Sequence, residues 1–145
     1  MTLTRDQVHR AAIGGTGLFV LTAFAAVLTT SARGLAWLCA LLLFAAGAVA
    51  YFAAYARVVR RSRTERVELA AFIFLAGSAP KRVRRTLVGC TLLQFATALI
   101  SAGLRPYTSL AFGIMTPMYG LGLQAFWAAF FGTFPPRVED EVRKV

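Results

Sequence analysis

Apolar residues fill four long stretches of the chain, and charged residues fall only outside these stretches. Uncharged runs separate Arg10 from Arg33, Arg33 from Arg57, Arg85 from Arg105, and Arg105 from Arg137. Each run holds about 20 residues or more, and a helix of about 20 apolar residues crosses a bilayer. The pattern therefore predicts four membrane-spanning helices.

The predicted spans cover residues of about 11–32, 34–56, 86–104 and 109–131, within a single membrane domain. Each span must be helical because lipid offers no partner for backbone N–H and C=O groups. We therefore predict an all-α integral membrane protein, a bundle of four transmembrane helices. Pro117 lies inside the last span, where a proline removes a backbone donor and kinks a helix. Such a kink either gates a path or only bends the helix to fit the bundle.

Lysine and arginine are divided unequally between the connections. Two lie in the N-terminal tail, nine in the connection 57–85 and three in the tail 132–145, whereas the two short connections hold only Arg33 and Arg105. Basic residues of membrane proteins gather on the cytoplasmic side. The count predicts both termini and the long loop in the cytoplasm, an N-in/C-in protein of the cell membrane.

The first apolar run has a second interpretation, as a secretory signal peptide. Arg5 and Arg10 precede the run, and residues 30–32 are small enough for cleavage. The apolar core of a signal peptide has about 7–15 residues, and this run is longer. We therefore expect the segment to remain as a span.

The connection 57–85 predicts a basic helical extension of the second span, followed by a short apolar helix at 69–77. This run is too short to cross a bilayer, so it lies at the interface, dips into the membrane as a re-entrant segment or packs beneath the bundle. The basic residues of the connection are candidate contacts for anionic lipid headgroups or an acidic protein partner. They are Arg57, Arg60, Arg61, Arg63, Arg66, Lys81, Arg82, Arg84 and Arg85.

Composition and charge exclude several classes of protein. Hydrophobic residues make up 58% of the 145 residues and charged residues 15%, whereas a soluble domain has about 25% charged residues. The net charge of +10 falls mainly in the predicted cytoplasmic segments, so it reports topology rather than nucleic-acid binding. The predicted spans contain no Asp, Glu or His. We therefore predict no catalytic residues, no metal and no cofactor.

Uncharged polar side chains gather in the predicted cytoplasmic half of the spans. They are Thr16, Tyr51, Tyr55, Gln94 and Gln124. These side chains either line a cleft or form hydrogen bonds between helices. On the second span, Ala46, Ala50 and Ala54 recur every four residues beside Gly47 and Ala53, which predicts a face for close helix packing within or between protomers.

The leading functional hypothesis is a non-enzymatic accessory or scaffold subunit of a bacterial inner-membrane complex, with a protein partner or a second copy in the membrane. This hypothesis depends on the uncharged spans, the small-residue face and the basic loop. The bacterial origin is suggested by the composition, which is rich in arginine and poor in lysine, as is typical of a high-GC bacterium. The alternative is a small homo-oligomeric transporter or channel for a lipid, an amphiphile or a small solute, suggested by the polar cluster and Pro117. The third hypothesis is a lipid-modifying enzyme that uses Glu65 or Glu68 as a base. It ranks last because acidic residues are common at the start of a helix, which explains both glutamates without catalysis.

Overall fold

The computed structural model describes residues 4–63 and 65–135, so residue 64 of the predicted loop and residues 136–145 of the predicted tail lie outside it. The described residues form helices and no β-strand, which confirms the all-helical class. The elements are α1 (Arg5–Leu28), α2 (Arg33–Arg61), α3 (Leu69–Ile73), α4 (Lys81–Leu104), the 3₁₀ helix η1 (Ser109–Met115) and α5 (Pro117–Phe131).

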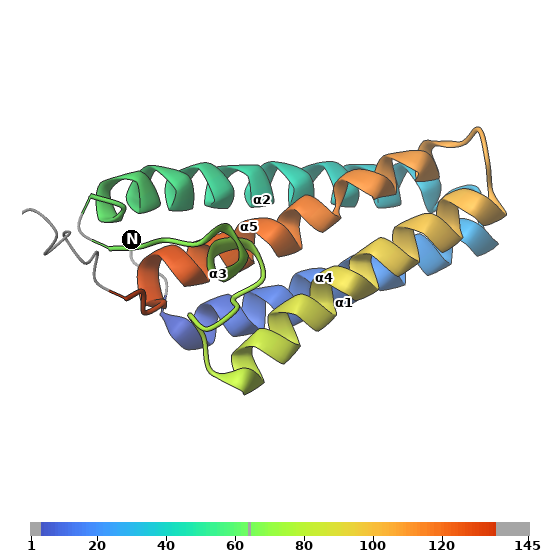
Figure 1. Ribbon diagram of the computed structural model, residues 1–145. Coiled ribbons are helices and arrows are strands. Elements are labelled where there is room, and N and C mark those ends of the chain that lie inside the picture. Colours follow the sequence, from blue (N-terminus) through green and yellow to red (C-terminus); the bar gives the residue numbers. More distant parts are fainter. Residues whose placement is uncertain (1–3, 64, 136–145) are drawn as a thin grey trace, which may run out of the picture.

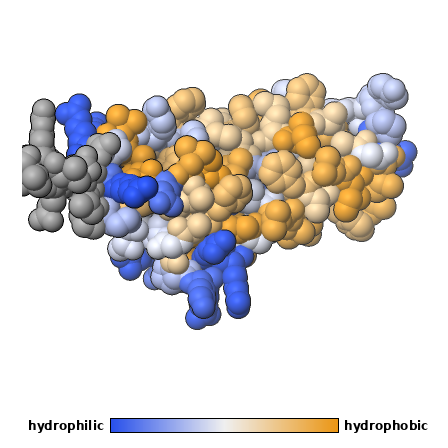
Figure 2. Space-filling model, viewed as in Figure 1, coloured by the Kyte–Doolittle hydropathy of each residue, from blue (hydrophilic) through white to orange (hydrophobic). Residues whose placement is uncertain are grey.

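Three of these helices, α1, α2 and α4, are long and apolar enough to cross a membrane. They have 24, 29 and 24 residues, and at about 1.5 Å per residue each exceeds the bilayer core of about 30 Å. Large apolar side chains such as Leu21, Phe24 and Leu99 are more than half exposed. Figure 2 shows apolar side chains over the middle of the molecule and hydrophilic ones near its ends. These features agree with a multi-pass membrane protein.

The helices form an elongated bundle in which α5 lies between two groups (Figure 1). α2 packs along α5 on one side, α1 and α4 pack together on the other, and α5 contacts all three. The starts of α1 and α4 and the ends of α2 and α5 meet at one end of the bundle. We call it the basic end, because it carries Arg5, Arg57, Arg60, Arg61, Lys81, Arg82, Arg84 and Arg85.

Helix α1 begins six residues before the predicted span. Thr4 and Gln7 form a capping box, in which the Thr4 side chain accepts from the Gln7 N–H at 3.3 Å and the Gln7 side chain accepts from the Thr4 N–H at 2.8 Å. This reciprocal pair satisfies donors that a helix start leaves without partners. The apolar pattern marks only the membrane-buried part of the helix, so it missed this first turn and a half.

The predicted last span, 109–131, is two helices rather than one kinked helix. Residues Ser109–Met115 form the 3₁₀ helix η1, and α5 begins at Pro117. Proline is favourable at the first position of a helix because the amide there needs no helical partner. Pro117 therefore starts a helix, and the structure replaces the predicted kink with a break.

The short apolar run of the long connection packs against the bundle. α3 covers only Leu69–Ile73, and it contacts α5 near the basic end. Phe72 and Leu75 are buried, and the Ser78 hydroxyl donates to the carbonyl of Ala71 at 2.8 Å. The structure therefore shows this run packed on the bundle, against α5.

Candidate functional site

Gln94 is a fully buried glutamine that joins three helices. From α4, its Nε2 donates to the hydroxyl of Thr16 on α1 at 2.7 Å. Its Oε1 accepts the backbone N–H of Gly120, in the first turn of α5, at 3.2 Å. The first amides of a helix have no partner within that helix, so Gln94 satisfies a donor that the break before α5 exposes. A Cβ on Gly120 would collide with Thr91 and Gln94, so only glycine permits this approach.

Gln124 forms a second connection between α5 and α4. Its Nε2 donates to the hydroxyl of Thr91 at 2.5 Å and lies 3.5 Å from the carbonyl oxygen of Leu87. The Thr91 hydroxyl in turn donates to the Leu87 carbonyl at 3.1 Å. The Oε1 of Gln124 is buried and has no hydrogen-bond partner among the described residues. Thr91 was not predicted, although its position one turn before Gln94 places both on the same face of α4.

The structure brings Thr16, Gln94 and Gln124 into the same region of the core and leaves the two predicted tyrosines outside it. Tyr51 packs against the rings of Phe52 and Phe72, with centroids 6.3 and 5.9 Å away. Tyr55 is 55% exposed. Both lie on α2, whose packed face looks onto α5 rather than onto Gln94.

Tyr119 belongs to the buried core and was missed by the sequence analysis. Its hydroxyl donates to the carbonyl of Ala11 on α1 at 2.7 Å. Its ring occupies the space that a Cβ on Gly15 would fill. Gly15 therefore makes room for an aromatic ring of α5, a pairing that one sequence does not reveal.

The backbones of α2 and α5 touch at two glycines. A Cβ on Gly122 would collide with the carbonyl of Gly47, and a Cβ on Gly47 would collide with the backbone of Tyr119. Part of the predicted small-residue face, at Gly47 and Ala54, is therefore buried in this contact, while Ala46 and Ala53 of the same face stay exposed.

The exposed alanines of α2 line a groove of about 540 Å³ along α5. We call it the apolar groove, and its walls come from α1, α2 and α5. They are Ala11, Ala45, Ala46, Val49, Ala50, Ala53, Tyr119, Leu123 and Phe126.

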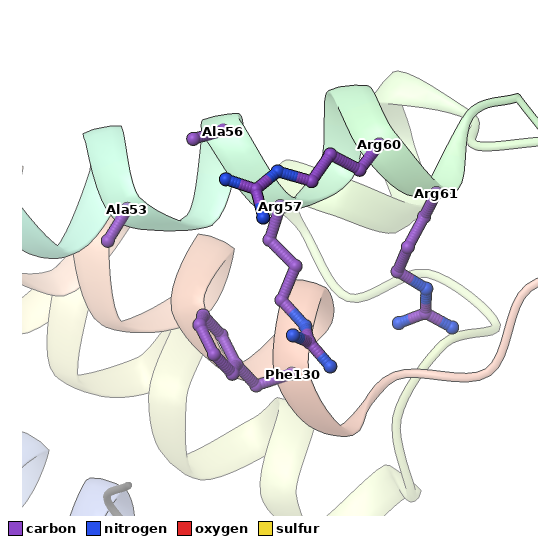
Figure 3. A pocket seen from close by; sticks show the side chains of 6 residues that line it. All are labelled: Ala53, Ala56, Arg57, Arg60, Arg61 and Phe130. Atoms are coloured by element: carbon purple, nitrogen blue, oxygen red, sulfur yellow. The ribbon is translucent and has the colours of Figure 1, made fainter. Parts of the chain in front are cut away.

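A second hollow, of about 400 Å³, lies at the basic end of the same two helices. We call it the arginine pocket, and it is lined by Ala53, Ala56, Arg57, Arg60, Arg61 and Phe130 (Figure 3). The Arg57 guanidinium lies over the Phe130 ring, 4.5 Å from its centroid. This cation–π contact gathers positive charge against an aromatic wall.

Two of the pocket's arginines also stabilise the end of α5. Arg57 Nε donates to the carbonyl of Ala129 at 3.2 Å, and Arg61 donates to the same carbonyl at 3.0 Å and to that of Gly132 at 3.2 Å. Carbonyls at a helix end lack helical partners and carry partial negative charge. Arg61 also pairs with Glu65 at 2.7 Å. These arginines therefore have a structural task that their sequence positions did not indicate.

The remaining predicted basic residues are exposed at the basic end. Arg63 and Arg66 follow α2, and Arg82 lies in the first turn of α4. Lys81, Arg84 and Arg85 line a further hollow of about 510 Å³ together with Val88, Gly89 and Leu92. Figure 2 shows hydrophilic side chains projecting where α4 begins.

Within residues 4–63 and 65–135, no group of three or more His, Cys, Asp and Glu side chains could hold a metal ion. Cys39 and Cys90 are free thiols. Comparisons with protein-family models, with curated proteins and with solved structures find no match to this chain. Function is therefore inferred from the arrangement of the side chains.

Proposed function

We propose that this protein is a non-enzymatic accessory or scaffold subunit of a bacterial inner-membrane complex. The supporting observation is that its two buried glutamines bond to its own helices. Gln94 is 0% exposed and Gln124 is 1% exposed, and both connect α4 to its neighbours. Glutamines bonded in this way connect helices rather than line a polar path across the membrane. This favours a scaffold, which works through its outer surface, over the alternative of a transporter or channel.

The proposal includes four membrane crossings with both termini in the cytoplasm. η1 and α5 have 7 and 15 residues, and rises of about 2.0 and 1.5 Å per residue give a combined length of about 36 Å. That length supports a fourth crossing of the core of about 30 Å. Among the described residues, Arg33 and Arg105 are the only basic ones at the opposite end of the bundle. The excess of positive charge at the basic end favours the cytoplasm for that end.

The outer face of α4 is the surface we propose for the partner. Gly89, Ala96 and Gly103 are exposed at seven-residue spacing, and a Cβ on either glycine would meet no atom within 4 Å. Small residues at this spacing allow a second membrane helix to pack closely. The hollow lined by Lys81, Arg84 and Arg85 continues this face at the basic end, where it suits an acidic segment of the same partner.

Extraction in mild detergents followed by affinity purification tests this role. We expect a stoichiometric protein to co-purify, and Ala96→Leu to lower its yield at least fivefold by blocking the close approach. Ala25→Leu is the matched control, because Ala25 is an exposed alanine on α1. Isolation of the chain alone from several detergents would contradict the accessory role, and equal yields from the two variants would contradict the α4 surface.

A further inference from the structure

The apolar groove and the arginine pocket are two parts of one continuous surface. Ala53 lines both of them. Phe126 of the groove stacks on Phe130 of the pocket, with ring centroids 4.3 Å apart. The surface therefore follows α2 and α5 from an apolar stretch to a cationic one at the basic end, where Figure 3 shows Ala53 preceding the arginines on α2.

The dimensions of this surface match one leaflet of a bilayer. Ala46 in the groove and Arg60 in the pocket are fourteen residues apart on one helix, which is about 21 Å at 1.5 Å per residue. Half of a bilayer, with its headgroup region, is about 20–22 Å thick. A lipid lying beside α2 would therefore place its headgroup at the arginines and its chain at the alanines.

The charges of the pocket select an anion. Three arginines line it, and no acidic side chain of the described residues does. The carboxylate of Glu65 pairs with one of the three, Arg61. Arg57 uses its Nε–H on the Ala129 carbonyl, but a guanidinium carries five N–H donors. Arg60 is exposed and has no ion-pair or hydrogen-bond partner among the described residues. Arginine forks bind phosphate oxygens two at a time.

We propose that this surface binds an anionic phospholipid of the leaflet at the basic end. Its phosphate lies in the arginine pocket, and one acyl chain lies along the apolar groove. A zwitterionic lipid fits less well, because its own cation would approach the three arginines. The site does not depend on the accessory role, since it lies on α2 and α5 rather than on the outer face of α4.

Native mass spectrometry of the purified full-length protein, titrated with phosphatidylglycerol or phosphatidylcholine, tests the site. We expect phosphatidylglycerol to bind at least fivefold more tightly than phosphatidylcholine. Arg60→Gln should weaken phosphatidylglycerol binding about fivefold, the effect of one basic side chain near an anionic lipid surface. Ala46→Leu, which fills the groove without changing charge, should weaken binding of both lipids by a similar factor.

The matched controls are Arg105→Gln and Ala25→Leu, an exposed arginine at the opposite end of the bundle and an exposed alanine on α1, both away from this surface. Both should bind phosphatidylglycerol within twofold of the unaltered protein, and unfolding in detergent identifies any variant that has lost its fold. Equal affinity for the two lipids would overturn the proposal, as would site variants that match their controls. Displacement of phosphatidylglycerol by millimolar inorganic phosphate, with Ala46→Leu silent, would also overturn it and assign the pocket to a soluble anion.

Discussion

α5 packs against α2 and against α4 in two different ways. On the α2 side, Gly47 and Gly122 bring the backbones together with no side chain between them. On the α4 side, Gln94 and Gln124 bridge the helices by hydrogen bonds. Lipid is as apolar as leucine, so apolar burial alone does not hold membrane helices together. The bundle uses close dispersion contact on one side of α5 and polar bonds on the other.

The two interfaces should therefore fail for different reasons. The α2–α5 contact depends on two glycines that have no side chain, so a side chain added at either position should separate the helices. The α4–α5 contact depends on paired donors and acceptors, so the loss of a partner should matter more than a change in volume. The substitutions below separate these two cases.

Gly122→Val should have the largest effect, because its side chain would occupy the position of the Gly47 carbonyl. Overpacking in a filled core costs about 1–3 kcal/mol and occasionally more, and here the obstacle is backbone. We expect a loss of about 3 kcal/mol in the free energy of unfolding, measured by titration with sodium dodecyl sulfate in mixed micelles. Gly103→Val is the control, since a Cβ there meets no neighbour. Similar losses in the two variants would show that the close approach is not needed.

Gln94→Leu should have an intermediate effect, because it leaves the Thr16 hydroxyl and the Gly120 N–H without their partner. An unsatisfied buried polar group costs about 1–3 kcal/mol. A double-mutant cycle with Thr16→Val isolates the side-chain bond, and interhelical hydrogen bonds in membranes give coupling energies of about 0.6–1.7 kcal/mol. Strict additivity of the two substitutions would contradict the bond.

Gln124→Met should have the smallest effect, within about 1 kcal/mol of the unaltered protein. The Oε1 of Gln124 already lacks a partner among the described residues, so its removal offsets part of the bond lost at Nε2. Thr91 keeps its own acceptor at Leu87. The same unfolding titration checks this, and a cost equal to that of Gln94→Leu would show that both glutamines are equally important.

Position along a helix axis is easier to predict from this sequence than rotation about that axis. The uncharged runs located α1, α2 and α4, and residue counts placed Thr16 and Gln94 at a similar depth, where they bond. Tyr51 lies at a similar predicted depth but on another face. Neighbouring residues on a helix differ by about 100°, so the step from Ala46 to Gly47 separates an exposed position from the contact with α5.

Two features depend on tertiary partners: the break before α5, and the difference between the arginines that bond to α5 and those that do not. A proline within an apolar run indicates a kink, but Pro117 starts a new helix, and the Gly120 amide is satisfied by a glutamine of α4. The nine basic residues of the long connection look equivalent in the sequence. Only the position of the α5 carbonyls distinguishes Arg57 and Arg61 from the others.

The break also relates the order of synthesis to the order of assembly. α5 is the last described helix, and the groups that satisfy its two ends, Gln94 at its start and Arg57 and Arg61 at its end, all come earlier in the chain. Backbone groups without partners are costly in lipid. Because the ribosome makes the N-terminal part first, the side chains that satisfy both ends of α5 are already made when α5 emerges.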